Sequence, residues 1–92
     1  MDTMPTIKLY GAVRCHKTQY YQLLLDDMGL AFEFLDVELD EAHAEALRQL
    51  YENRKLHFPT ITIGKKKLRN PSKETLIKWL DKLLPNRSSF NI

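Results

Sequence analysis

Apolar residues recur along the chain with two different spacings, which divide its first half into predicted strands and helices. Alternation over residues 6–10, stopping at Gly11, predicts a short strand. Apolar residues at three- and four-residue steps over 16–28 predict an amphipathic helix, and Gly29 suits its C-terminal cap. Residues 32–39 are rich in aromatic and branched side chains and predict a second strand, so that strand, helix and strand form a parallel crossover unit.

The same reasoning assigns two helices and two strands to the second half. Asp40 can cap a helix that runs to about Asn53, with an inner face of Ala44, Leu47, Leu50 and Tyr51. Residues 60–63 and 66–69 predict two strands around a tight turn, and Ser72 can cap a last helix that ends before Pro85. The order β, α, β, α, β, β, α predicts an α/β fold with a four-stranded sheet and helices on both of its faces.

Length and composition indicate one small domain without a large charged surface. The 92 residues, 43% of them hydrophobic, suit a single domain over 1–92 with its core at about 6–84 and a flexible tail at 85–92. The balance of 14 basic and 12 acidic residues argues against nucleic-acid and membrane partners. The start of the chain resembles neither a signal peptide nor a membrane span, and a single cysteine fits a reducing compartment, so we expect a cytoplasmic protein.

The one cysteine, Cys15, is the main candidate for chemistry. It lies in the loop between the first strand and the first helix, where ligands of open α/β sheets bind and where the helix dipole favours an anion. Arg14 and Lys17 add positive charge, and a lower thiol pKa raises the fraction of nucleophilic thiolate. The structural alternative, a buried cysteine that only fills space, is less consistent with this position.

Thr18 follows Cys15 by three residues and should face the same side of the helix. A two-thiol redox motif has its second cysteine at this place. Threonine cannot resolve a mixed disulfide, but its hydroxyl could donate a hydrogen bond to the thiolate. An ordinary first-turn threonine is the alternative, and the sequence does not separate the two.

The motifs together resemble the glutaredoxin branch of the thioredoxin fold over residues 6–84. The resemblance rests on IKLY before Cys15 in CHKT, on FEFLDV, and on FPTITIG. It implies a thioredoxin-like fold with a four-stranded mixed sheet and three helices. It also implies that Cys15 is the nucleophile, that Pro59 is cis and faces it, and that the backbone of Phe58 pairs with the cysteinyl part of glutathione.

Several positions depart from the family pattern. Thr18 replaces the second cysteine, Lys17 the aromatic residue of the motif, and His16 its proline. Leu56 stands where a basic residue is usual, and residues 68–75 lack the expected Gly-Gly and acidic pair. Arg14, Lys17 and Arg69 are therefore the candidates for binding glutathione carboxylates.

The histidines do not indicate a metal site, because no paired-cysteine or HExxH spacing occurs. We interpret His16, His43 and His57 as surface or helix residues. His57 is the one that the resemblance brings close to the thiol, where an imidazolium would favour thiolate.

The leading hypothesis is a thiol-disulfide oxidoreductase that works by a monothiol mechanism on Cys15. Glutathione or glutathionylated proteins are the expected partners, with a disulfide-bearing protein target as a further one, and no tightly bound cofactor is expected. The rival hypothesis is a redox-sensing or protein-binding module without efficient turnover. A dimeric iron-sulfur carrier is a minor alternative, since CHKT differs from the Cys-Gly-Phe-Ser of that class.

Overall fold

The computed structural model of the protein describes residues 5–84, and the predicted tail at 85–92 lies outside the described residues. Seven elements follow one another in the predicted order. They are β1 (Ile7–Gly11), α1 (His16–Asp27), β2 (Glu33–Asp36), α2 (Glu41–Arg48), β3 (Thr60–Ile63), β4 (Lys66–Arg69) and α3 (Lys73–Leu83).

The four strands form one mixed sheet in the order β2-β1-β3-β4, which confirms the predicted fold class. β1 pairs with β2 in parallel and with β3 in antiparallel orientation, and β3 and β4 are antiparallel. The turn between β3 and β4 places Gly64 at a φ of 59°, which glycine adopts without the steric cost of a Cβ. β1 and β3 are therefore the central strands.

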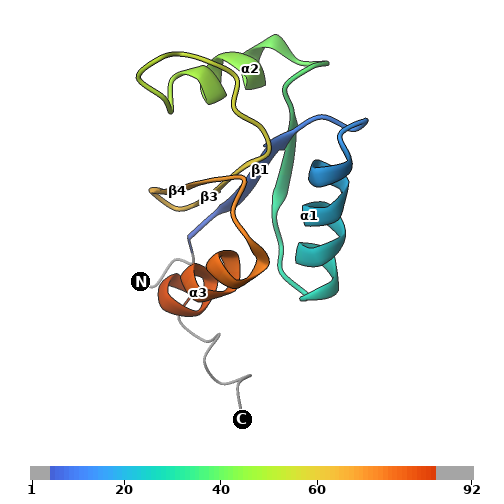
Figure 1. Ribbon diagram of the computed structural model, residues 1–92, viewed down its shortest axis with the longest axis vertical. Coiled ribbons are helices and arrows are strands. Elements are labelled where there is room, and N and C mark those ends of the chain that lie inside the picture. Colours follow the sequence, from blue (N-terminus) through green and yellow to red (C-terminus); the bar gives the residue numbers. More distant parts are fainter. Residues whose placement is uncertain (1–4, 85–92) are drawn as a thin grey trace.

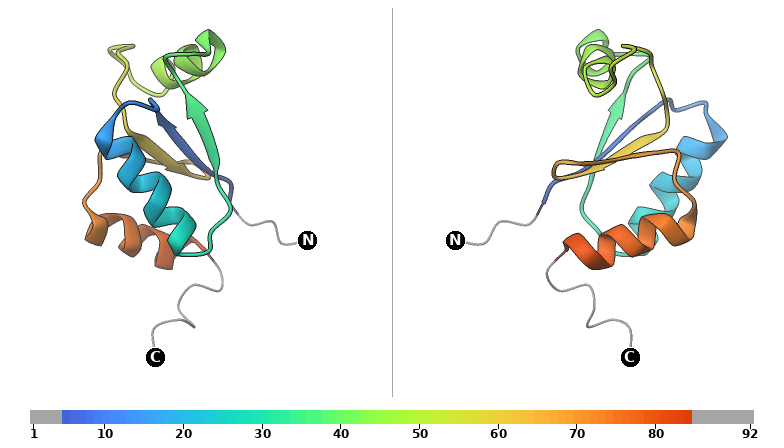
Figure 2. Two further views of the ribbon diagram at one scale, coloured as in Figure 1. Left: turned by 90° about the vertical axis from the view of Figure 1, so that its right-hand side faces the viewer. Right: turned by 60° about the vertical axis from the view of Figure 1, so that its left-hand side comes forward.

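The helices cover the two faces of the sheet unequally (Figures 1 and 2). α1 and α3 lie on one face and enclose the larger core, whereas α2 lies over the end of the other face where β1 and β2 finish. Alternation along β1 explains this division, because Leu9 belongs to the larger core and Tyr10 to the smaller one. The buried residues of the larger core are Ile7, Leu9, Tyr21, Leu25, Ile61, Ile63, Leu68, Leu76, Leu80 and Leu84.

The predicted capping residues are found at the ends of the three helices. Asp40 caps α2 by accepting from the Ala42 amide, and Ser72 caps α3 by accepting from the Thr75 amide. Gly29 follows the last residues of α1 with a φ of 73°. No helix within residues 5–84 is long and apolar enough to cross a membrane.

Two elements, β2 and α2, are shorter than predicted. β2 ends at Asp36, where Oδ1 of the carboxylate accepts from the amides of Glu38 and Leu39, both at 2.8 Å. These two hydrogen bonds turn the chain out of the strand. α2 ends at Arg48, well before Asn53, and the chain continues through turns that bring Leu50 and Tyr51 against the smaller core.

Candidate functional site

Cys15 is the N-cap residue of α1, as predicted. Its backbone is extended, with φ −83° and ψ 121°, and its amide donates to the Ala12 carbonyl at 3.0 Å. Its carbonyl accepts from the Gln19 amide at 2.9 Å, which starts the helix. The residue is partly exposed. The thiol is therefore held at the positive end of a helix dipole with access from solvent.

The surroundings of Cys15 lower the pKa of its thiol. Burial is the largest single effect and opposes ionisation, but it is outweighed by the Thr18 hydroxyl, the amides of Thr18 and Lys17, and the Lys17 charge. The side chain makes no capping hydrogen bond of normal geometry. A neutral thiol is a weak acceptor, so these donors interact chiefly with the thiolate. The lowered pKa gives Cys15 a larger fraction of nucleophilic thiolate than an ordinary cysteine has at the same pH.

Thr18 is fully buried, and its hydroxyl is held in place by the backbone of the preceding loop. Its Oγ1 accepts from the Ala12 amide at 3.3 Å. A Cβ atom at Gly11 would lie 2.4 Å from Oγ1 and 2.5 Å from Cγ2 of Thr18, so only glycine fits against this side chain. Because the oxygen already accepts from Ala12, its own proton is free to be donated toward Cys15.

Arg14 forms an ion pair with the Glu38 carboxylate, so its charge does not act on the Cys15 thiol alone. Its guanidinium makes two hydrogen bonds to Glu38, of 2.9 and 2.5 Å. The Glu38 carboxylate, through hydrogen bonding and charge, raises the pKa of Arg14, and Cys15 adds a smaller effect of the same sign. The pairing with Glu38, which the sequence did not indicate, compensates much of the charge that Arg14 could offer to an anion.

Phe58 and Pro59 enter the sheet beside the loop that carries Cys15. The Phe58-Pro59 bond is cis, as the family resemblance predicts. Tyr10 and Thr60 are register partners, so Pro59 lies next to the end of β1 from which the Cys15 loop departs. The Pro59 carbonyl accepts from the Asn70 amide at 2.9 Å, which ties this segment to the end of β4. Direct contact between Pro59 and the thiol stays a prediction from the resemblance.

His57 is surrounded by cations that disfavour its protonated form. Burial lowers the pKa of its imidazole, and the charges of Arg69, Lys55 and Lys67 lower it further. Its ring packs edge-on against that of Tyr51 with centroids 4.5 Å apart. The expected role of an imidazolium in stabilising the thiolate therefore lacks support in this structure.

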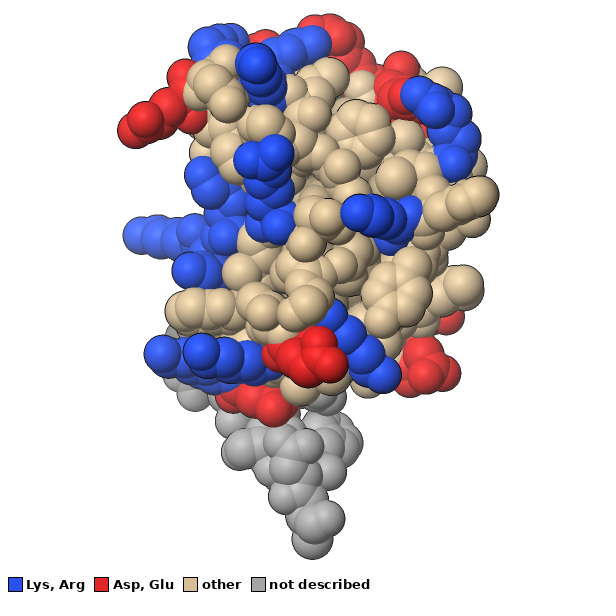
Figure 3. Space-filling view, viewed as in Figure 1, with Lys and Arg blue, Asp and Glu red and all other residues tan. Residues whose placement is uncertain are grey.

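Basic side chains gather along the side of the molecule that carries β4 and the segment before β3 (Figure 3). Two of them are held by aromatic rings: Lys66 lies 4.0 Å from the ring centroid of Trp79, and Lys67 lies 4.2 Å from that of Tyr51. Sequence analysis missed these contacts, because nothing in the local pattern pairs Lys67 with a residue 16 positions earlier. The lysines near the turn are thus partly ordered.

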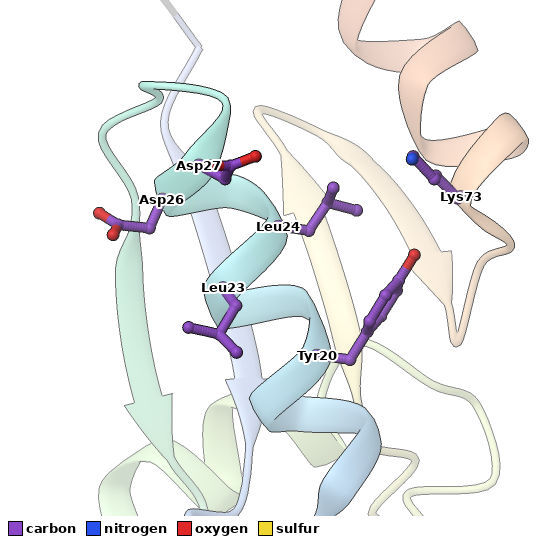
Figure 4. A pocket seen from close by; sticks show the side chains of 6 residues that line it. All are labelled: Tyr20, Leu23, Leu24, Asp26, Asp27 and Lys73. Carbon is purple, nitrogen blue, oxygen red and sulfur yellow. The ribbon is translucent and has the colours of Figure 1, made fainter.

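A cavity of about 370 Å³ between α1 and α3 lies away from the thiol (Figure 4). Tyr20 extends from α1 toward α3, where Lys73 lies, and Leu23 and Leu24 complete the apolar lining. Cys15 is not among its lining residues. Among residues 5–84, no group of three or more His, Cys, Asp or Glu side chains is arranged to hold a metal ion.

Comparison with known proteins shows which solved structures have a fold similar to that of this chain. No family model matches the chain, and no curated protein matches it significantly. Among solved structures, the thioredoxin-like protein BC3987 is 25% identical, with a TM-score of 0.65 over 86% of this chain and 100% of that one. A point mutant of the same thioredoxin-like protein gives a TM-score of 0.68 at 25% identity over 82% of this chain and 99% of that one.

A glutaredoxin from Archaeoglobus fulgidus has the same fold, with a TM-score of 0.68 at 18% identity over 82% of this chain and 85% of that one. The likeness covers 82–86% of this chain, which has the mixed four-stranded sheet and the three helices described above. Its one cysteine stands at the start of α1. The chain has the thioredoxin fold and carries a single-cysteine CHKT motif at the start of α1.

Proposed function

We propose that the protein is a thiol-disulfide oxidoreductase that acts on glutathione mixed disulfides through Cys15 alone. The observation that carries the proposal is the partly exposed thiol at the N-terminus of α1, with its pKa lowered despite partial burial. Thr18 supports a monothiol cycle, because it occupies the place of a resolving thiol and offers a hydroxyl instead.

The proposed reaction has two exchange steps. The Cys15 thiolate attacks the glutathione sulfur of a protein-glutathione disulfide, a bond forms between Cys15 and glutathione, and the protein leaves as a thiolate that takes a proton from water. The thiolate of a second glutathione then attacks the glutathione sulfur bound to Cys15. This step releases oxidised glutathione and restores the Cys15 thiolate. The first glutathione is in a disulfide before and after the cycle, so the second glutathione is the reductant that is oxidised as the protein thiol is reduced.

Glutathione is the proposed co-substrate rather than a tightly bound cofactor. The backbone of Phe58, at the cis bond to Pro59, is the proposed partner of its cysteinyl part, by resemblance to the family. Lys17 and Arg69 are the better candidates for its carboxylates, because both are exposed and neither forms an ion pair within residues 5–84, whereas Arg14 is paired with Glu38. A reducing compartment such as the cytoplasm would supply the glutathione.

The test is turnover of a small glutathione mixed disulfide, with reduced glutathione as donor and glutathione reductase as readout. We expect the wild-type protein to turn over and Cys15→Ser to lose all activity. Lys17→Gln should raise the KM for the mixed disulfide, whereas Lys78→Gln, an equal charge change on the exposed side of α3, should leave it unchanged. Activity that persists in Cys15→Ser would refute the proposal.

One observation favours a second candidate, a redox-sensing module without efficient turnover. The Arg14–Glu38 pair removes one basic group that could hold a glutathione carboxylate. In this case Cys15 would form a glutathione adduct that persists in the presence of reduced glutathione. The same assay separates the two candidates, because a sensor would give an adduct by mass spectrometry but no sustained turnover.

A further inference from the structure

A hollow of about 510 Å³ lies on the face of the sheet that carries α2, separate from the Cys15 site. α2 covers only the end of this face near Tyr10, and the part farther down the strands carries no other helix of residues 5–84 (Figure 2). Neither Cys15 nor Pro59 lines it. The lining residues are Thr6, Lys8, Tyr10, Leu50, Thr62, Gly64, Lys65 and Lys67.

Strand register explains why lysines converge on this hollow. Lys8 of β1 and Thr62 of β3 are direct partners, and Thr62 and Lys67 of β4 are partners in turn. The three side chains therefore form one row on one face. Because neighbouring strands lie about 4.8 Å apart, the backbones of Lys8 and Lys67 are about 10 Å apart, with the Thr62 hydroxyl between them. Lys65 joins the row from the adjoining turn.

The positive charge of this row is not neutralised within the described chain. Across residues 5–84, neither Lys8 nor Lys65 nor Lys67 forms an ion pair with a carboxylate. Glu33 of β2 is the partner of Lys8 at the other end of the row and is the nearest acidic position in the sheet. Glu33 therefore offsets part of the charge of Lys8, whereas Lys67 on the edge strand has only Thr62 as its register partner.

Lys67 is already ordered at the rim of the hollow. Its ammonium donates to the Leu50 carbonyl at 2.6 Å and lies over the Tyr51 ring. An ammonium has three donors, so donor capacity remains for a ligand beside the contacts with Leu50 and Tyr51. Tyr10 adds a phenol, which is protonated at neutral pH even at its ordinary pKa of about 10. Burial, followed by the charge of Glu33, raises that pKa further. The hollow therefore combines cations and hydroxyl donors.

We infer that this hollow binds a small molecule bearing phosphate groups, independently of the thiol. Phosphate carries close to two charges at neutral pH and offers several acceptor oxygens, which matches a row of ammonium and hydroxyl donors. A volume of about 510 Å³ lies in the range of small-molecule sites. Lys8 and Lys65 contact the ligand directly, and Lys67 closes the side next to Leu50.

Inorganic pyrophosphate is the probe, titrated into the full chain by calorimetry and followed by amide NMR shifts. We expect the largest shifts at Lys8, Thr62 and Gly64, and affinity about tenfold weaker in Lys8→Gln and in Lys65→Gln, or about 1.4 kcal/mol. Lys78→Gln on α3 is the matched control and should bind normally. Adenosine diphosphate, if bound more tightly than pyrophosphate, would indicate an organic phosphate; equal affinity would indicate that phosphate alone is recognised.

Two results would overturn the inference: no binding at millimolar pyrophosphate, or equal weakening by Lys8→Gln and Lys78→Gln, which would indicate only a response to net charge. Cys15→Ser should bind pyrophosphate as the wild type does. The proposed phosphate site and the proposed oxidoreductase function can therefore be refuted independently of each other.

Discussion

The contact between Gly11 and Thr18 predicts that adding one methyl group beside the candidate site will destabilise the protein. In Gly11→Ala the new Cβ would lie 2.4 Å from Oγ1 and 2.5 Å from Cγ2 of Thr18. Nonbonded atoms normally lie about 3.5 Å or more apart, so one of the two groups must move. Thr18 has no free space, because it is fully buried and its oxygen accepts from the Ala12 amide.

The expected cost combines overpacking with a lost hydrogen bond. Overpacking of a core costs about 1–3 kcal/mol. If Thr18 moves away, the buried Ala12 amide loses its acceptor, at about 1–3 kcal/mol more. We therefore expect Gly11→Ala to lose at least about 2 kcal/mol, which for a domain of this size lowers the melting temperature by about 10 °C.

A double-mutant cycle in urea, followed by circular dichroism, measures whether Thr18 is the cause. Thr18→Ala removes both close atoms and leaves the Thr18 Cβ at 3.0 Å from the new methyl group. Gly11→Ala should therefore cost less in the Thr18→Ala background than alone. Gly29→Ala is the matched control, since its cost comes from a φ of 73° with no atom within 4 Å of the new Cβ, and it should be additive with Thr18→Ala. Additivity in the Gly11 cycle would refute the reasoning.

Three further predictions concern the thiol and acid stability. Thr18→Val should raise the pKa of Cys15 by removing the hydroxyl donor, while Thr18→Ser should retain a low value, as measured by thiolate absorbance against pH. Thr18→Cys should place a second thiol one turn from Cys15 and produce an internal disulfide under mild oxidation, detected as the loss of both free thiols. The Glu45 carboxyl has a pKa lowered from 4.5 to about 2, first by Arg54 and then by Gln49 and Arg48, so its contribution to stability should be present above pH 4.5 and be lost as the pH falls toward 2. Glu45→Gln should weaken that part of the acid-unfolding profile, and an unchanged profile would contradict the assignment.

Local sequence pattern predicted the order and type of all seven elements. It combined apolar periodicity with the aromatic and branched residues of the second strand and with cap and turn residues. It failed at the ends of β2 and α2. At Asp36 a carboxylate competes for backbone amides and turns the chain, although the residues that follow have strand-like side chains.

Some features of the candidate site could be predicted from the sequence, and others depend on contacts between distant residues. The position of Cys15 at a helix start follows from local pattern, and the cis bond before Pro59 follows from family resemblance. The pairing of Arg14 with Glu38 joins residues 24 positions apart through the parallel crossover, and no local spacing indicates it. The close fit of Thr18 on Gly11 likewise depends on how α1 packs on β1, so the sequence left its role open.

The central claim is that Cys15 alone carries the glutathione intermediate of a catalytic cycle. Intact-mass spectrometry of protein quenched in acid tests it most directly, after mixing with a glutathione mixed disulfide and again after adding reduced glutathione. We expect one glutathione adduct, located on Cys15, that forms first and then disappears as oxidised glutathione accumulates. A protein that forms no adduct, or an adduct that reduced glutathione does not remove, would contradict it.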